Sequence, residues 1–589
     1  MGTKDSTNGK RKQPEGGNNE KEQSSTRQKR AMKQERQSHR RHADAVVEAK
    51  SIWNKLRLRT NTKEETSAMA DNLMGLLRGK MVEVALQHDA SRVVQAAVQF
   101  GNEKQRREIA KELGSKISEL AKSQYAHFVV LKLIKYCVRD DEAVRLIVKS
   151  LKGHISKLAV HAVGARVVEL LFSTFPPKST TLLKQEIYGP QFTLFTDGAL
   201  SGGTAASPTL QSVFKTATPS QKKSALEHVH GLLQKGIDKG LFGFTYYQSL
   251  FCEYVIAATP NDIRSIAPSV VDHSIHMLST RAGARVVAEC AAYGTVKDRK
   301  NIMRSLKGYT RSSLLHRDAY IAVLRLADVV DDTVTLDKNV LVELQENPDA
   351  KNKSDSPILD LALSETGSKL FLMLLPKNDE ARLKYFDPYE LEVLHSNPTI
   401  LEKGEEVPTS KKNPDTRRME LSQHLRVSLV DLCQKHAGEL LRSTSGGKVL
   451  REVNRAFSNA EVIKSIVKAC DEKVDDDDEK LPIFEDPVGH LVVKHLLTDD
   501  AESGEEKEKS NSFSTLLYKK FKGKLMSSIG TSNRGAFVLT ALAKVDAVKD
   551  DVIAELLKHK SDIKALVDEH QSKKAGFLAL WNEIQPSTK

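Results

Sequence analysis

The sequence lacks the features of a secreted or membrane-spanning protein. Its five cysteines are far apart in 589 residues and form no CxxC pair, so we expect reduced, intracellular thiols without a disulfide framework. The amino terminus has no apolar core of the kind that a secretory signal needs, and no later stretch approaches the roughly 18 uninterrupted apolar residues of a membrane span. The sequence therefore predicts a soluble protein without a membrane partner. The cysteines are Cys137, Cys252, Cys290, Cys433 and Cys470.

Two further absences concern fold and catalysis. No sustained alternation of apolar and polar residues indicates strands, and no strand-helix alternation indicates a parallel sheet. The Gly-Gly-Lys at 446–448 resembles the end of a phosphate-binding loop, but an earlier glycine is missing and Val449 stands where Ser or Thr would hold magnesium. His490 and His495 are five residues apart and do not share a helical face as a zinc pair would. We therefore predict no enzyme activity, no metal and no cofactor.

The charged residues favour a polyanionic partner. Lys and Arg number 90 against 77 Asp and Glu, which gives a formal net charge of +13 and a pI of about 9.2. Residues 1–42 are almost devoid of apolar side chains and predict a disordered tail. Its basic clusters at 10–12 and 27–41 are typical of nuclear localisation or nucleic-acid contact. Gly2 and Ser6 also satisfy a loose myristoylation template, which leaves acylation of Gly2 open.

A repeat of about 36 to 38 residues runs through the rest of the chain. The segment 77–85 begins with L-x-G and is followed by Arg-Val-Val at 92–94; the same pattern recurs 74 residues later at 151–159 and 166–168. A third copy lies midway, and weaker copies extend to the carboxyl half. Such a unit holds two or three helices and cannot bury its apolar face alone, so neighbours must stack. The sequence predicts an all-α helical repeat solenoid with the Val-Val doublets facing inward.

Two interruptions divide the predicted array. Residues 195–222 are rich in small residues, Ser and Thr, and predict a flexible insertion. Residues 400–416 contain two prolines and mixed charges, and predict a connection between two arms. We therefore expect amino-terminal repeats over 43–395, divergent carboxy-terminal repeats over 396–570, and a terminal segment over 571–589.

The units resemble the repeats of the Pumilio (PUF) family. The segment 89–95, Asp-Ala-Ser-Arg-Val-Val-Gln, is similar to the family's second-helix motif, in which two residues that read base edges flank a stacking residue. By this resemblance Ser91 and Gln95 would read base edges and Arg92 would stack. In the other copies Leu, Ala or Val often stands at the edge-reading places and cannot hydrogen-bond a base. Base-by-base reading of sequence is therefore not expected.

A narrower resemblance rests on the order and spacing of the segments at 324–333, 371–376, 485–494 and 533–539. They look like the nucleolar Puf-A branch, whose carboxy-terminal part is the CPL region. This resemblance implies about eleven repeats in an L-shaped array, one of them in divergent sequence between 377 and 439. It also implies RNA or DNA binding with little sequence preference, a nuclear and nucleolar location, maturation of the large ribosomal subunit, and repression of certain messenger RNAs. The implied partners are pre-ribosomal RNA, messenger RNA and ribosome assembly proteins, and we expect a monomer.

The candidate nucleic-acid contacts are basic, polar and aromatic side chains near the repeat turns. A basic groove would neutralise phosphates and release counterions, giving an affinity that falls steeply with salt and varies little with sequence. Phe128 and Tyr320 could stack on bases, although Phe128 equally suits a core position. The alternative function is a protein-binding scaffold of the HEAT or armadillo kind. The candidates are Lys80, Ser91, Arg92, Gln95, Lys116, His127, Lys132, Lys135, Arg166, Arg285, Arg317, Tyr320, Lys369, Lys448, Lys494 and Arg534.

Overall fold

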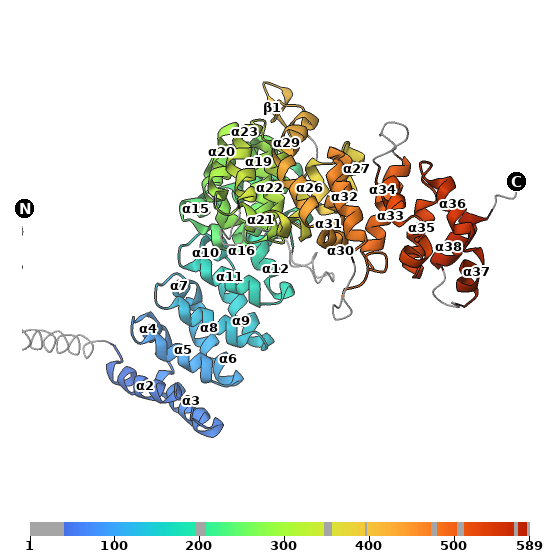
Figure 1. Ribbon diagram of the computed structural model, residues 1–589. Coiled ribbons are helices and arrows are strands. Elements are labelled where there is room, and N and C mark those ends of the chain that lie inside the picture. Colours follow the sequence, from blue (N-terminus) through green and yellow to red (C-terminus); the bar gives the residue numbers. More distant parts are fainter. Residues whose placement is uncertain are drawn as a thin grey trace, which may run out of the picture. The chain divides into compact units, whose positions relative to one another are not determined.

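The chain is built from helices joined by short turns (Figure 1). The computed structural model describes residues 41–194, 208–346, 356–394, 397–472, 480–502, 512–569 and 575–585. The predicted basic tail and the template at Gly2 lie outside them, apart from residues 41 and 42. The described residues confirm the predicted all-α repeat solenoid, and none of their helices is both long and apolar enough to cross a bilayer. Contacts divide the chain into two compact units, Met1–Tyr247 and Gln248–Lys589.

The first unit contains the repeats that the sequence shows most clearly. The helix α16 (Thr245–Ala257) begins in this unit and continues into the second. The other α-helices of the first unit are α2 (Ala43–Leu56), α3 (Lys63–Leu77), α4 (Met81–Leu86), α5 (Ser91–Phe100), α6 (Glu103–Leu113), α7 (Ile117–Leu120), α8 (His127–Cys137), α9 (Asp141–Leu151), α10 (Ile155–Ala159), α11 (Gly164–Thr174), α12 (Pro177–Tyr188), α13 (Gln191–Leu194), α14 (Leu210–Phe214) and α15 (Pro219–Asp238).

The second unit adds a two-stranded hairpin to its helices. Its strands are β1 (Thr399–Glu402) and β2 (Glu405–Pro408). Its α-helices are α17 (Pro260–Ile266), α18 (Ser274–Met277), α19 (Arg281–Tyr293), α20 (Val296–Leu306), α21 (Thr310–Leu315), α22 (Tyr320–Val329), α23 (Thr333–Leu336), α24 (Val342–Gln345), α25 (Leu359–Leu363), α26 (Ser368–Leu374), α27 (Asp379–Leu383), α28 (Pro388–Val393), α29 (Pro414–Lys435), α30 (Ala437–Arg442), α31 (Thr444–Phe457), α32 (Ala460–Cys470), α33 (Gly489–Glu502), α34 (Phe513–Phe521), α35 (Asn533–Leu542), α36 (Lys549–Leu557), α37 (Lys560–Glu569) and α38 (Ala575–Ile584).

Each clear repeat consists of a short helix, a middle helix and a closing helix. In the first unit the middle helices α5, α8 and α11 pack side by side, and the closing helices α6, α9 and α12 form a second row. The apolar doublet of each middle helix is fully buried, as in Val93–Val94 and Val167–Val168. The prediction that these doublets face inward is confirmed.

The L-x-G motif marks a turn that only glycine adopts easily. Gly79, Gly153 and Gly308 have φ values of 70°, 84° and 81°, in the left-handed region that side chains with a Cβ disfavour. The amide of Gly153 donates to a carboxylate oxygen of Glu186 on the closing helix that follows, at 2.8 Å. The amide of Gly308 donates to Glu343 at 2.9 Å in the same way. Each such turn is thus held by an acidic residue some 33 to 35 positions later.

The insertion predicted over 195–222 is shorter than expected. Residues 195–207 lie outside the described part, but α14 begins at Leu210 and α15 at Pro219. Thr218 accepts a hydrogen bond from the amide of Gln221, whose side chain accepts from the Thr218 amide at 2.8 Å. This capping box starts α15, so the prediction of an irregular segment up to 222 is wrong.

The hairpin was not predicted. The connection expected over 400–416 is instead the antiparallel pair of β1 and β2 followed by the start of α29. Lys403 and Gly404 join the strands with φ values of 53° and 90°, the positive angles of a two-residue primed turn. The Asn261 side chain pairs with the backbone of Leu401 at 2.8 and 2.9 Å. Strands of four residues are too short to show an alternating pattern.

Candidate nucleic-acid interface

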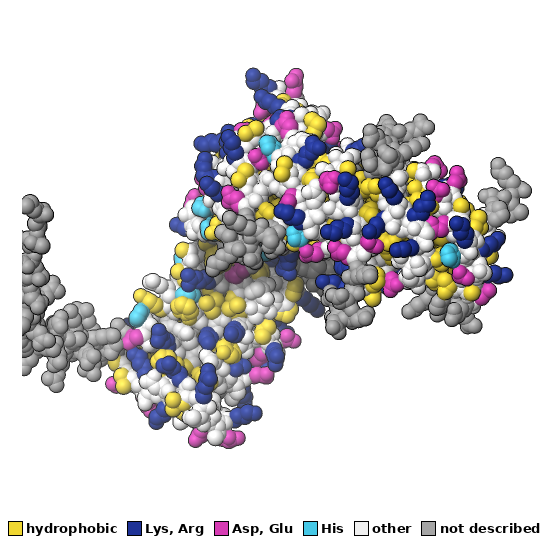
Figure 2. Space-filling view, viewed as in Figure 1, with side chains coloured by type: hydrophobic (Ala, Val, Ile, Leu, Met, Phe, Trp, Pro, Cys, Tyr) yellow, Lys and Arg dark blue, Asp and Glu magenta, His cyan; other side chains and the backbone are white. Residues whose placement is uncertain are grey.

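The middle helices of the first unit present an open face. Arg92, Phe128 and Arg166 occupy the place immediately before the apolar doublet, here called the pre-doublet position, and all three are exposed. Phe128 keeps 44% of its surface open to solvent, so it is not a core residue. Figure 2 shows Lys and Arg side chains set among apolar ones over the amino-terminal helices. The open face comprises Arg92, Gln95 and Gln99 of α5, Phe128, Lys132 and Lys135 of α8, and Arg166 of α11.

The positive charges of the open face are held by polar and aromatic neighbours. Lys132 Nζ donates to Gln99 Oε1 at 2.8 Å, which links α8 to α5. The Arg92 guanidinium carbon lies 5.9 Å from the ring centroid of Trp53 on α2. Among the described residues, neither Arg92 nor Arg166 has a carboxylate within ion-pair distance. Their charge therefore remains available to an anionic ligand.

Two predicted edge readers are used inside the protein. Ser91 is only 2% exposed; its hydroxyl donates to the Tyr125 carbonyl at 3.0 Å and accepts from the Gln95 amide nitrogen at 2.9 Å. His127 is also 2% exposed, and its Nδ1 lies 3.0 Å from the Ser123 carbonyl oxygen. Both side chains are buried, so neither offers an accessible group for reading a base.

His127 and the edge positions of α11 are also unsuited to reading sequence, for the following reasons. Burial, helped by the charge of Arg166, lowers the pKa of His127, so the ring is neutral at physiological pH. Ala165 is fully buried. Glu169 accepts hydrogen bonds from the first amides of α16, those of Thr245 at 3.2 Å and Tyr246 at 3.1 Å. The open face thus offers charge and a ring, with few free groups at the edges.

Several predicted contacts lie outside the helices of this face. Lys80 and Lys116 precede the short helices α4 and α7, and Lys116 pairs with Glu119 at 2.8 Å. The Arg317 side chain is 89% exposed, in the turn before α22, and pairs with its neighbour Asp318 at 3.2 Å. These cations therefore lie on turns outside α5, α8 and α11.

Three more predicted contacts occupy pre-doublet positions but are covered. Arg285 of α19 and Tyr320 of α22 are 8% and 7% exposed, and the Lys369 side chain of α26 is 15% exposed. The segment 385–393, which includes α28, lies over them. We expected accessible side chains at these three places. That prediction is wrong, because a segment distant in the sequence folds onto the helices.

A third set of candidates lies on α31, α33 and α35, which pack in order. Lys448 is exposed, whereas Lys494 is half-buried with its Nζ 5.6 Å from the Phe537 ring centroid. Arg534 is exposed and donates to the Glu485 carbonyl at 2.7 Å. Sequence analysis missed Leu491, which is 44% exposed; the doublet that follows it was the available signal.

A second missed feature is the aromatic side chain at the amino end of the open face. Trp53 of α2 is half-buried, and Arg57, which caps the carboxyl end of that helix, lies over its ring at 5.0 Å. Because α2 packs against α5, the pair extends the open face by one helix. The Trp-x3-Arg spacing was the available signal, but it lies before the first recognisable repeat.

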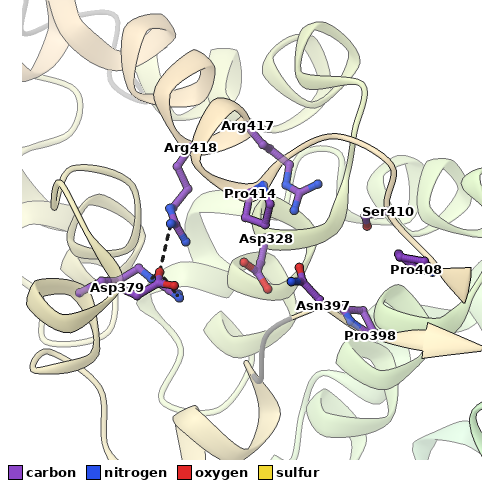
Figure 3. Close-up of a pocket in the computed structure, with 10 residues that line it drawn as sticks. Asp328, Asp379, Asn397, Pro398, Pro408, Ser410, Pro414, Arg417 and Arg418 are labelled. Carbon is purple, nitrogen blue, oxygen red and sulfur yellow. Dashed lines mark hydrogen bonds and ion pairs between the residues drawn. The ribbon is translucent and has the colours of Figure 1, made fainter. Parts of the chain in front are cut away.

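A polar pocket in the second unit carries no free charge of note (Figure 3). It lies between the loop after the hairpin and the first turn of α29. Arg417 pairs with Asp331 at 2.8 Å, and Arg418 pairs with Asp379 at 3.0 Å. Arg382 shares Asp379 at 3.0 Å, so the lining arginines are neutralised within the protein. Within the described residues, no cluster of three or more His, Cys, Asp or Glu side chains is placed to hold a metal ion.

Parts of the chain match models of known protein families. The model of the Pumilio-family RNA binding repeat matches residues 80–113 and 116–149, which include α5 and α8, and the CPL (NUC119) domain model matches 364–509. The chain therefore carries Pumilio-type repeats and a CPL region. This Pumilio-repeat chain is 27% identical to human Pumilio homolog 3 over 556 residues, which cover 92% of the chain and 81% of that protein.

Other relatives agree with that assignment. The Pumilio homology domain family member 6 of Schizosaccharomyces pombe is 26% identical over 91% of the chain and 80% of its own length. The crystal structure of human Puf-A is similar with a TM-score of 0.73, at 25% identity, over 92% of the chain and 99% of that structure. A structure of human Puf-A in complex with DNA is similar with a TM-score of 0.71. The chain is thus similar to these proteins over most of its length.

Proposed function

We propose that the chain binds single-stranded RNA, and also DNA, with little sequence preference through the open face of α5, α8 and α11. The observation that carries the proposal is the alternation of Arg92, Phe128 and Arg166 at exposed pre-doublet positions. Arginines at this spacing suit phosphates, and a ring between them suits a base. The matching RNA-binding repeat model and the DNA complex of human Puf-A support the ligand class.

Low sequence preference follows from the state of the edge positions. Ser91 and His127 are buried, and Glu169 is engaged by α16. Specific reading requires free donors and acceptors aimed at base edges. Contacts of the open face therefore depend on charge and stacking, which every base and every phosphate satisfy.

Titration of labelled oligonucleotides tests this proposal. The full chain is mixed with single-stranded RNA, DNA of the same sequence, and a shuffled RNA, each at several salt concentrations. We expect log affinity to fall linearly with log salt and the two RNA sequences to bind within a few-fold of each other. Binding at micromolar strength or weaker, with no dependence on salt, would refute it.

At the cellular level we propose that the chain acts in the nucleolus as a monomer. There it would take part in maturation of the large ribosomal subunit, together with ribosome assembly proteins. We also propose that it represses translation of certain messenger RNAs. Its kinship with Pumilio homolog 3 and Puf-A supports this role. Crosslinking to cellular RNA followed by sequencing tests it. Recovery of pre-ribosomal RNA would support the ribosomal role, whereas messenger RNA alone would favour translational control.

The competing function is a protein scaffold. Charge reversal of Arg92 and Arg166 separates the two functions, because it would abolish RNA binding if the open face binds phosphates. Loss of a protein partner with RNA binding intact would favour the scaffold instead.

A further inference from the structure

The second unit repeats the pattern of the open face but closes it. Arg285, Tyr320 and Lys369 follow the same order of cation, aromatic and cation as the open face, on α19, α22 and α26. At the pre-doublet positions of the open face the side chains are exposed, and those of Lys448 and Leu491 are exposed too. This trio differs because the segment 385–393, here called the acidic strap, lies on it. We call the surface beneath the strap the covered face.

The carboxylates of the acidic strap contact the polar groups of the covered face one by one. Arg285 Nη2 donates to Glu392 Oε1 at 2.7 Å. The Tyr320 hydroxyl donates to Glu390 Oε1 at 2.6 Å, and Lys369 Nζ donates to Glu390 Oε2 at 2.7 Å. These are the donors that would meet phosphate oxygens if a polynucleotide lay there.

The aromatic rings of the strap lie against cations of the covered face, where bases would stack if a polynucleotide bound there. The Arg281 guanidinium carbon lies 3.6 Å from the Tyr389 ring centroid, and that of Arg285 lies 5.9 Å from it. Lys369 Nζ lies 5.2 Å from the ring of Phe386. Cations stack on aromatic rings as they stack on bases. The strap therefore supplies both kinds of contact that a nucleic acid makes: an anion and a ring.

Neighbouring residues of the strap are held differently. Glu390 is 1% exposed, and Val393 is buried to the same extent, so this part is anchored in the core. The Glu392 side chain is 58% exposed and forms an ion pair with the buried Arg285. Tyr389 is half-buried. Solvent can therefore reach the contacts made by Tyr389 and Glu392, which can be weakened without removing the anchor.

We propose that the covered face is a second binding site for single-stranded nucleic acid and that the acidic strap is an internal competitor that occupies it. The inference rests on the proposed function of the open face, because it assigns the same ligand class to the same pattern. An internal competitor lowers the apparent affinity of a site by the fraction of molecules in which the site is free. Weakening the strap should therefore raise binding at the covered face.

Photocrosslinking of the full chain to a thiouridine-substituted single-stranded RNA, with mapping of the linked peptides, tests the proposal. The strap variant is Tyr389→Ala/Glu392→Gln. The control variant, Tyr309→Ala/Glu402→Gln, removes one exposed ring and one exposed charge elsewhere in the same unit, since Tyr309 is 54% exposed and the Glu402 side chain is also 54% exposed. Both variants therefore change the net charge equally.

At low RNA concentration we expect crosslinks of the wild-type chain in α5, α8 and α11 only. The strap variant should add crosslinks in α19 and α22 at RNA concentrations about tenfold lower than the wild type requires, and adding Arg285→Ala should remove them. A strap variant that is folded by circular dichroism and shows the wild-type pattern would overturn the proposal. If it fails to fold, Glu392→Gln alone leaves Tyr389 and the anchor in place, and an unchanged pattern in that variant overturns the proposal equally.

The same maps separate this proposal from the proposed function. Absence of α5 and α8 crosslinks in the wild type would count against the open face. A gain in α19 and α22 in the strap variant would still support the covered face.

Discussion

The two kinds of side chain on the open face should affect binding in different ways. Replacing Phe128 by Ala removes a ring that is 44% exposed and carries no charge. Base stacking on such a ring is worth about 1 to 3 kcal/mol per base, so the dissociation constant should rise about 5- to 150-fold. The slope of log affinity against log salt should stay the same, because no phosphate contact is lost.

The double variant Arg92→Ala/Arg166→Ala should behave in the opposite way. Each phosphate neutralised on a single strand contributes about 0.7 to the salt slope, so losing two contacts should reduce the slope by about 1.4. Affinity should therefore fall most at low salt and converge with the wild type at high salt.

Fluorescence anisotropy with a labelled single-stranded RNA over a salt series measures both quantities. Tyr309→Ala and Arg317→Ala are matched controls, since each removes an exposed ring or cation that is not on α5, α8 or α11. An Arg92→Ala/Arg166→Ala protein that keeps the full slope would refute the phosphate contacts. A Phe128→Ala protein that binds within twofold of wild type would refute the stacking role.

Three further predictions concern stability and use thermal unfolding followed by circular dichroism. Arg106 donates to the carbonyls of Val98 at 3.0 Å and Tyr136 at 3.3 Å, so Arg106→Met should cost about 2 kcal/mol; an unchanged melting temperature would contradict this. A Cβ at Gly283 would lie 2.0 Å from the Met277 carbonyl oxygen, whereas one at Gly75 would meet nothing within 4 Å. Gly283→Ala should therefore cost about 1 to 3 kcal/mol while Gly75→Ala should be harmless, and equal effects would disprove the steric argument. Because the folded-state pKa of His127 lies below its ordinary value of 6.5, its contribution to stability is complete above pH 6.5 and is lost as pH falls through the folded-state pKa. His127→Asn should flatten the fall in melting temperature as the pH drops below about 6.5, and a fall as steep as in the wild type would argue against the assignment.

Sequence pattern predicted the local parts of this molecule well. The doublets and L-x-G turns follow from contacts within one repeat or between neighbours, and such contacts leave a periodic trace. The candidates Arg92 and Arg166 were found for the same reason, while Phe128 suited a core position equally well. The resemblance to Pumilio repeats added the role of the position before each doublet.

Contacts between residues far apart in the chain left no such trace. Glu390 lies 70 positions from Tyr320, and Glu392 lies 107 positions from Arg285. Glu289, one turn later on α19, lies 3.5 Å from Arg285, but nothing near Arg285 in the sequence shows that Glu392 also covers it. The same holds for Arg299, which donates to the Val329 carbonyl and to the Thr409 hydroxyl at 2.8 Å each. Accessibility is a property of the folded chain, so the covered candidates could not be separated from the open ones beforehand.

The glycine turns also decide where the array can be cut. The amide of Gly153 donates to Glu186, that of Gly308 to Glu343, and that of Gly523 to Glu555 at 3.0 Å. The glycine turn of each of these repeats therefore depends on a carboxylate from the helices that follow it. A fragment that ends before the acidic helix leaves these amides without their carboxylate and frays at its new carboxyl end. Unravelling should then spread backwards from that end, one neighbour at a time, as in a linear chain of coupled units. Fragments intended for separate study should therefore end beyond Glu186 or Glu343, even where the helices that bind the ligand lie well before those residues.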